Sequence, residues 1–242
     1  MSSHPTAATR PQREWPLLCA DSVVRNILPG AQTQDRRPVV FSRRWAHLPA
    51  RTPVPTEWRL YVDGEGSVRN EFADVIAKSP VDGDLLWVRE AHAFCPKSPL
   101  MERWSHTPEE ARVLYRADGK VTLSGPHGIW SVKWRPNIHM PRWACRLVKP
   151  IVRSFVERIQ EISESDAIAE GVRLIELRVG PGAPRLGWTS RQSGEQWTLH
   201  ATARDAFRFE IWEPLYPGSW ERNDWVGGVE WTNPLPGVGA HQ

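Results

Sequence analysis

Short apolar segments separated by polar turns dominate the first forty residues of the chain. The run WPLLCA (15–20) has the length of a β-strand, and Asp21 or Ser22 can cap the short helix that we expect next. Apolar side chains recur at helical spacing in that helix, and a Pro-Gly pair ends it. The polar stretch AQTQDRR (31–37) predicts a basic turn, and PVVFS (38–42) predicts a second strand.

The middle of the chain carries three further apolar runs of strand length. LLWVREA (85–91) follows a Gly-Asp turn and alternates apolar with other residues, which predicts a strand. ARVLYRAD (111–118) predicts another strand, and the Asp-Gly pair that follows is typical of a hairpin turn. We therefore expect VTLSG (121–125) to return as the partner strand of this hairpin.

The last hundred residues combine an irregular stretch, two capped helices and a final strand. Two prolines in residues 134–148 exclude regular structure from the first half of that segment, and residues 151–162 have an extended pattern. Capping-box patterns begin at Ser163 and at Thr202, and each predicts the start of a helix. A strand over residues 225–231 is expected to finish the domain.

This order of elements predicts an α+β protein with a mixed, barrel-like sheet, flanking short helices and long loop insertions. It lacks the alternating strand–helix pattern of a doubly wound fold. We expect one domain over residues 15–232 between polar tails at 1–14 and 233–242. The loop insertions are expected in three segments: 42–80, 95–110 and 178–200.

Composition supports a loop-rich globular protein. The 14 tryptophans, 22 prolines and 17 glycines argue against a helical bundle, and 40% hydrophobic with 24% charged residues argues against whole-chain disorder. The N-terminus has no apolar signal segment, no apolar run is long enough to span a membrane, and three scattered cysteines do not suggest a disulfide framework. We therefore expect a cytoplasmic protein.

The net charge of +3 conceals strongly basic and acidic segments. Residues 130–158 contain seven lysines and arginines and one acidic residue, and residues 35–59 contain six arginines and two acidic residues. Residues 161–176, in contrast, are mostly acidic. Trp130, Trp134 and Trp143 are interleaved with the first basic segment. Cations beside flat rings are typical of a nucleic-acid surface, and they are equally consistent with a solvated strand face over core tryptophans.

Six segments occur in an order that resembles the ASCH domain proteins of phages and prophages, which have the PUA-like fold. They are SVVRNILPGAQTQDRRPV (22–39), GDLLWVRE (83–90), WRPNIHMPRWACR (134–146), ERIQEISESDAIAEGV (157–172), ARDAF…W (203–212) and PGSWERNDWV (217–226). The resemblance covers residues 15 to 231 apart from the insertions. It implies a small mixed β-barrel with helices at its side and a cleft that binds RNA or a modified nucleotide.

Some small ASCH proteins are amidohydrolases that remove the acetyl group from acetylcytidine. The resemblance carries their site over to Gly30, Thr33, Arg37 and Glu170. Two of the family's positions differ here, because Gln32 replaces a lysine and residue 35 is an aspartate instead of a threonine. A glutamine cannot act as a base or carry charge, so the resemblance leaves open whether this chain is an enzyme.

The candidate residues fall into a catalytic and a binding group. Glu170 is the candidate base and Arg37 the candidate source of positive charge. The binding candidates are side chains of the turn before the second strand, of the strand that ends at residue 90, and of the irregular basic segment: Gln32, Thr33, Asp35, Arg36, Arg89, Lys133, Trp134, His139, Arg142 and Trp143. We expect Arg89 either to line the cleft or to pair with Glu90.

Three functions are compatible with these residues. The first is an ASCH-type protein that binds RNA, another nucleic acid or a modified nucleoside. The second is a hydrolase of nucleosides or nucleic acids, either an acetylcytidine amidohydrolase or a ribonuclease. The third is a phage protein that binds another protein through its insertions. No cofactor is expected, and no metal, because His92 and Cys95 form a single pair without a second pair at zinc-ligand spacing.

Overall fold

The computed structural model describes most of the chain between residues 11 and 233. The described residues are 11–39, 60–62, 68–70, 80–96, 107–109, 111–121, 123–125, 128–130, 132–178, 182–191 and 198–233. The predicted insertions at 42–80 and 95–110 lie largely outside them, as do residues 234–242. Within the described part, the chain has the mixed α+β architecture that the sequence predicts.

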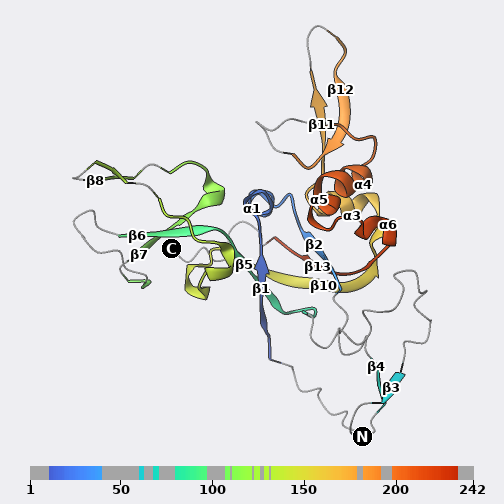
Figure 1. The fold of residues 1–242 in the computed structure, drawn as a ribbon, viewed down its shortest axis with the longest axis horizontal. Coiled ribbons are helices and arrows are strands. Elements are labelled where there is room, and N and C mark those ends of the chain that lie inside the picture. The colour runs from blue at the N-terminus through green and yellow to red at the C-terminus, as the bar shows by residue number, and fades with distance from the viewer. Residues whose placement is uncertain are drawn as a thin grey trace, which may run out of the picture.

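A five-stranded mixed sheet forms the centre of the molecule (Figure 1). Its strands, in spatial order, are β1 (Glu14–Leu18), β5 (Leu85–Arg89), β10 (Val148–Arg158), β13 (Trp225–Trp231) and β2 (Gln34–Pro38). β1 and β5 are parallel, and the other neighbours are antiparallel. The long strand β10 pairs with β5 at its start and with β13 along the rest, so it joins the two halves of the sheet.

Four two-stranded ladders extend from this sheet (Figure 1). They pair β3 (Leu60–Val62) with β4 (Val68–Asn70), β6 (His92–Pro96) with β7 (Ala111–Tyr115), β8 (Leu123–Gly125) with β9 (Gly128–Trp130), and β11 (Arg173–Leu177) with β12 (Arg185–Thr189). β6, β7 and β8 form an arm on one side of the molecule, and β11–β12 projects beyond the helices (Figure 1).

The helices are short. They are α1 (Asp21–Ile27), α3 (Glu164–Ala169), α4 (Ala203–Ala206), a π-helical segment (Phe207–Trp212), α5 (Glu213–Leu215) and α6 (Ser219–Arg222). Single 3₁₀ turns occur at Arg116–Asp118, Asn137–His139, Arg142–Ala144 and Ile159–Glu161.

Both predicted capping boxes start helices. The Ser163 hydroxyl accepts from the Asp166 amide at 3.1 Å at the start of α3, and the Thr202 hydroxyl accepts from the Asp205 amide at 3.0 Å at the start of α4. The prediction for the first helix was wrong in its cap, because Asp21 is the first helical residue and its carboxylate accepts from Arg116 at 2.6 Å.

The sheet separates two apolar cores. One lies under α3 to α6 and includes Phe207, Trp212 and Val226. The other lies between β1, β5 and α1 and includes Leu17 and Trp231. Every second residue of a strand points to the same face, so the two cores alternate along β13, with Val226 in the first and Trp231 in the second.

The sheet has two ends, β1 and β2, and so does not close into a barrel within the described residues. A side chain bridges these ends, because Arg37 Nη2 of β2 donates to the Leu18 carbonyl of β1 at 2.8 Å. The mixed sheet is therefore confirmed, and the small closed barrel of the PUA-like fold is not.

Three predictions about strands were wrong. Residues 34–37 of the expected basic turn, together with Pro38, form strand β2. The buried Arg36 of this strand is paired with acids, so the polar sequence conceals an edge strand. The hairpin expected between residues 111–118 and 121–125 does not form: β7 pairs with β6, and β8 pairs with β9. The polar insertion expected at 178–200 contains β12, which pairs with β11.

Candidate functional site

Strand β2 sends its side chains alternately to the two faces of the sheet. Gln34 and Arg36 are buried on the face that α3 covers, whereas Asp35 and Arg37 lie on the other face. Arg36 pairs in the ladder with Gly228 of β13, and Arg37 pairs with Gly227. The absence of side chains at these two glycines opens space on both faces of β13 beside the arginines.

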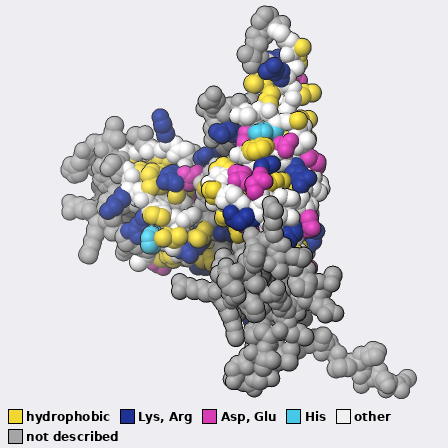
Figure 2. All heavy atoms as spheres, turned by 45° about the vertical axis from the view of Figure 1, so that its right-hand side comes forward, with side chains coloured by type: hydrophobic (Ala, Val, Ile, Leu, Met, Phe, Trp, Pro, Cys, Tyr) yellow, Lys and Arg dark blue, Asp and Glu magenta, His cyan; other side chains and the backbone are white. Residues whose placement is uncertain are grey.

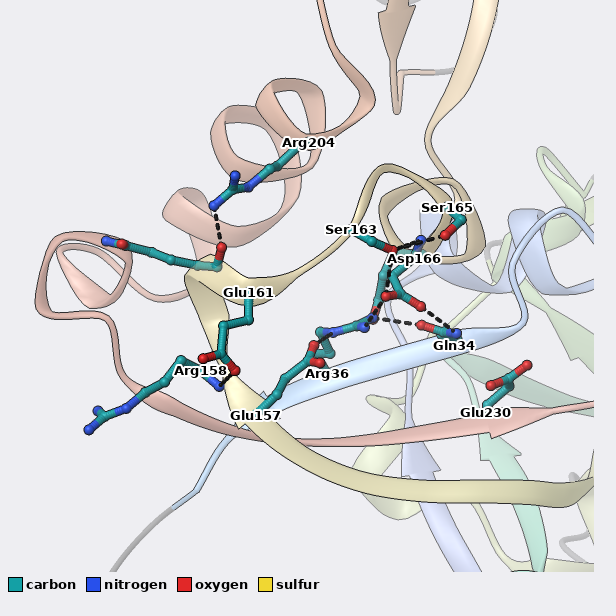
Figure 3. Close-up of polar contacts among 12 residues, drawn as sticks. Gln34, Arg36, Glu157, Arg158, Glu161, Ser163, Ser165, Asp166, Arg204 and Glu230 are labelled. Carbon is teal, nitrogen blue, oxygen red and sulfur yellow. Dashed lines mark hydrogen bonds and ion pairs between the residues drawn. The ribbon is translucent and has the colours of Figure 1, made fainter. Parts of the chain in front are cut away.

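Arg36 is the centre of a buried polar group that we call the Arg36 cluster, comprising Gln34, Arg36, Glu157, Asp166 and Glu170. Arg36 donates from Nε to Glu157 at 2.7 Å and from Nη1 to Gln34 at 2.7 Å (Figure 3). Its Nη1 also donates to Glu170 at 2.8 Å. Its side chain is 0% exposed. Asp166 adds an ion pair at 3.5 Å and accepts from Gln34.

The Arg36 cluster joins elements that are far apart in the sequence. β2 supplies Gln34 and Arg36, β10 supplies Glu157, and α3 supplies Asp166 (Figure 3). The residue after α3 is Glu170. The guanidinium also lies 4.8 Å from the centre of the Phe155 ring. A Cβ atom at Gly228 would come within 2.2 Å of that ring, so the glycine permits this packing.

Burial changes the protonation of the cluster. Burial, together with the nearby Asp35 charge, raises the pKa of Glu170 to about 8, although the charge of Arg36 opposes this rise. For Arg36, burial alone would lower the pKa, but the Glu170 and Glu157 carboxylates outweigh this and raise it. We therefore expect the Glu170 carboxyl to gain or lose its proton closer to neutral pH than an ordinary glutamate does.

Asp35 and Arg37 form a separate pair on the opposite face. Arg37 Nε donates to Asp35 at 2.7 Å, and 42% of the Arg37 side chain is exposed. Burial raises the pKa of Asp35, and the charge of Arg37 opposes that rise. The pair therefore presents a carboxylate and a guanidinium next to each other at the junction of β2 and β1.

A cavity of about 610 Å³ opens beside this pair. Its walls come from β1, β2, β10, β13 and the turn before β5. The polar lining includes Asp35, Arg37, Asp82 and Ser154, and Trp15, Leu17 and Leu86 contribute to the apolar lining. The Trp15 indole is fixed in place because its Nε1 donates to Asp84 at 2.7 Å.

Gln32, Thr33 and Glu170 lie away from this cavity. Gln32 is buried, and its amide donates to the Gln34 carbonyl at 3.0 Å. The Thr33 backbone amide donates to the Ala169 carbonyl at 2.8 Å, which ties α3 to the start of β2. None of the three belongs to the described lining, so Arg37 lies at the cavity and Glu170 lies with Arg36.

Arg89 and the candidates of the irregular segment lie on or near the face of β1 and β5 that points away from the cavity. Arg89 donates to the Ile138 carbonyl and lies over the Trp87 ring at 5.1 Å. Arg142 binds Glu14 through two hydrogen bonds of 2.6 and 2.9 Å. Trp143 stacks on Phe94 at 5.1 Å and is 38% exposed.

Three candidates of that segment have different surroundings. Trp134 is half-buried against the small core of the arm, so for this tryptophan the packing interpretation holds. Lys133 and His139 are exposed. The expected pairing of Arg89 with Glu90 was wrong, because Glu90 accepts two hydrogen bonds of 2.9 Å from Arg146.

Ion pairs neutralise much of the basic segment between residues 130 and 158. Arg146 binds Glu90 and Asp118, and Arg153 binds Glu230. Because these acids lie far away in the sequence, the net charge counted within the segment overestimated the positive charge of the folded surface. Figure 2 shows acidic side chains gathered over the helical part of the molecule with lysines and arginines among them.

Several residues around the cavity and the cluster were absent from the sequence-based candidates. They are Trp15, Asp82, Ser154, Phe155, Glu157 and Asp166. The Gly-Gly pair at 227–228 was the one sequence signal for this region, since glycine within a strand often marks a site where a ligand or another chain segment approaches the backbone closely. If residues 34–38 had been assigned to a strand, the alternation of side chains would have placed Arg36 and Arg37 on opposite faces of the sheet.

Metal-ligand clusters and membrane-spanning helices are both absent from the described part of the chain. It contains no group of three or more His, Cys, Asp or Glu side chains arranged to hold a metal ion. None of its helices has the length and apolar character that crossing a membrane requires. Comparison of the chain with protein-family models, with curated proteins and with solved structures found no match.

Proposed function

We propose that the protein binds a nucleobase, as a nucleoside or within a nucleic acid, in the cavity between β1 and β2. The observation that carries this proposal is the Asp35–Arg37 pair on the wall of an otherwise largely apolar cavity. Its volume of about 610 Å³ lies within the range of roughly 300–1,000 Å³ for small-molecule sites. The resemblance to ASCH proteins supports the same class of ligand.

The chemistry of the pair matches the edge of a base. The Asp35 carboxylate accepts hydrogen bonds and the Arg37 guanidinium donates them, so together they complement a base edge with a donor beside an acceptor. Trp15, Leu17 and Leu86 in the lining provide apolar contact for a flat heterocycle. Cytidine and its acylated derivatives carry such an edge and are the first ligands to test.

Calorimetric titration with the four ribonucleosides and with acetylcytidine tests the proposal. We expect saturable binding of at least one of them, and a loss of about 10- to 150-fold in affinity for Asp35→Asn, because a charged hydrogen bond contributes roughly 1.5–3 kcal/mol. Gly227→Val, which adds a side chain on the cavity face of β13, should abolish binding. Arg178→Ala, an exposed arginine on another part of the molecule, is the matched control.

Unchanged affinity in both Asp35→Asn and Gly227→Val would refute the cavity as the binding site. Absence of binding to any nucleoside or to single-stranded RNA and DNA at low salt would refute the function itself. Circular dichroism of each variant establishes that the fold is intact before its affinity is interpreted.

A hydrolase that deacylates cytidine is the second proposal, and the raised pKa of Glu170 favours it, because a carboxyl with a pKa of about 8 can exchange a proton at neutral pH. It ranks second because Glu170 lies with Arg36 and not in the described lining of the cavity. Release of acetate from acetylcytidine should then disappear in Glu170→Gln. Acetate release at the wild-type rate in that variant would exclude Glu170 as the base.

A further inference from the structure

One wall of the cavity is a regular part of the central sheet. The strands β10, β13 and β2 lie side by side there (Figure 1), and Ser154, Val229 and Asp35 form one row across them. Residues directly opposite each other in antiparallel strands point to the same face, so these three side chains face the cavity that they line. Neighbouring strands are about 4.8 Å apart, which places the Cα atoms of Ser154 and Asp35 roughly 10 Å apart.

The middle of this wall is flat and apolar. Val229 is at the centre of the first row, and Gly227, which has no side chain, is at the centre of the next row, between Val156 and Arg37. All of these residues belong to the lining of the cavity. A flat ring that lies on the middle of the wall can therefore direct one edge to Asp35 and Arg37, and the rest of the ligand then extends toward β10.

The β10 end of the wall carries a second polar group, formed by Ser154 and Asp82. Asp82 belongs to the turn before β5, and its Oδ1 accepts from the Ser154 backbone amide at 3.1 Å. Both residues line the cavity, and Asp82 is exposed. The Ser154 hydroxyl is buried and has no hydrogen-bond partner in the described part of the chain. It rotates about a single bond, so it can meet a ligand group that binds beside Asp82.

Hydroxyl groups suit this second polar group, whereas a phosphate does not. The Asp82 carboxylate only accepts hydrogen bonds, and the Ser154 hydroxyl both donates and accepts. Two neighbouring hydroxyls of a ligand can therefore donate to Asp82 while one of them also bonds to Ser154. A phosphate would be repelled by Asp82, and Arg37, the one lysine or arginine in the described lining, lies at the opposite end of the wall.

We propose that Asp82 and Ser154 form a sugar subsite, which binds two neighbouring free hydroxyl groups of the ligand. This inference rests on the proposed base-binding function of the cavity. It adds that the base carries a ribose, whose hydroxyls lie at the far end of the ligand from the base edge at Asp35 and Arg37. A deoxyribose lacks one of these hydroxyls, and a nucleotide inside a nucleic-acid strand has one of them esterified, so both should bind more weakly.

Calorimetric titration with matched ligands tests the sugar subsite. Each of the four ribonucleosides is compared with its 2′-deoxy form and with its free base. We expect every ribonucleoside that binds to lose about 10- to 150-fold in affinity without the 2′-hydroxyl, which corresponds to the loss of a hydrogen bond to a charged group. The 3′-monophosphate of the same nucleoside should also bind more weakly, because its charge lies next to Asp82.

Two variants test the two residues of the subsite. Asp82→Asn removes the charge but keeps an acceptor for the Ser154 amide, and it should reduce the preference for ribose over deoxyribose at least about fivefold without changing free-base affinity. Ser154→Ala should weaken ribonucleoside binding by about 2- to 10-fold, as expected for one neutral hydrogen bond. Glu176→Gln is the matched control, because it makes the same kind of change at an exposed carboxylate outside the described lining.

The outcomes separate the sugar subsite from the cavity itself. If ribonucleosides bind and Asp35→Asn weakens them, but their 2′-deoxy forms bind equally well or Asp82→Asn keeps the preference for ribose, the sugar subsite is refuted and the base-binding function stands. An equal loss of free-base and ribonucleoside affinity in Asp82→Asn would also refute the subsite. If no nucleoside binds, or if neither Asp35→Asn nor Gly227→Val changes the affinity, the proposed function fails, and this inference fails with it.

Discussion

Arg36 and Arg37 are adjacent arginines on one strand, yet they have opposite surroundings. Arg36 is fully buried between Glu157 and Glu170, whereas Arg37 is partly exposed beside Asp35 at a cavity. The difference arises from the alternation of side chains along β2. Arg36 therefore holds β2, β10 and α3 together, whereas Arg37 is exposed at the cavity where we propose that the ligand binds.

Replacing the two arginines is the strongest way to test this contrast. Arg36→Ala removes the donor that bonds Gln34, Glu157 and Glu170, and each buried acceptor left without a partner costs about 1–3 kcal/mol. Arg37→Ala removes a partly exposed pair, worth at most about 1 kcal/mol. Urea denaturation measures both free energies of unfolding, and equal losses would contradict the contrast.

The two glycines opposite these arginines give a second matched comparison. A Cβ atom at Gly228 would lie 2.2 Å from Phe155, so Gly228→Ala must displace the ring beside Arg36 and should cost about 1–3 kcal/mol. At Gly227 the nearest atom would be Val39 Cγ2 at 3.8 Å, so Gly227→Ala should have little effect on stability. Thermal unfolding of the two variants decides the point, and a larger loss for Gly227→Ala would be inconsistent with the packing described.

The contribution of the Arg36 side of β2 to the free energy of unfolding should also depend on pH. The pKa of Glu170 is about 8 in the folded protein and 4.5 as its ordinary value, so between these pH values the folded state holds a proton that the unfolded state has lost. Its contribution to stability is therefore full below pH 4.5 and is lost as pH rises through 8. Glu170→Gln should flatten this part of the profile of unfolding free energy, and parallel profiles would rule out a protonated Glu170.

The cap of α3 offers the mildest perturbation of the same side. Ser163→Ala removes the acceptor for the Asp166 amide, which should cost about 1 kcal/mol. Because α3 covers the Arg36 side, nucleoside affinity should not change. Thermal unfolding and calorimetry on the same sample check both statements, and a loss of affinity larger than threefold would show that the two sides are coupled.

The sequence predicted best those elements whose signals are local. Both capping boxes start helices at the expected residues, since the cap and its partner are three positions apart. β13 follows the extended pattern expected for residues 225–231. β10 follows the pattern expected for residues 151–162 as far as Arg158, after which Ile159–Glu161 form a 3₁₀ turn. β2 was mistaken for a turn because its residues are polar. Their hydrogen-bond partners come from other elements, and a hydrophobic pattern along the sequence contains no information about such partners.

Non-local pairing explains what the sequence could not predict. β7 was assigned to the wrong partner because hairpin signals describe only neighbouring segments. Asp35, Arg36 and Arg37 were among the sequence-based candidates, but their division between two faces was not foreseen. Arg36 lies 121 residues from Glu157 and 134 from Glu170, so their contact depends on the folded sheet.

Nuclear magnetic resonance of side-chain N–H groups tests most directly whether the ligand binds on the Arg37 side. In a sample labelled with ¹⁵N, the signals of Trp15 Nε1–H, Arg37 Nε–H and Arg36 Nε–H are followed while the binding nucleoside is added. We predict that the Trp15 and Arg37 signals shift with a common saturation curve and that the Arg36 signal stays in place. Movement of Arg36 with Arg37 and Trp15 unchanged would contradict the assignment of the two sides.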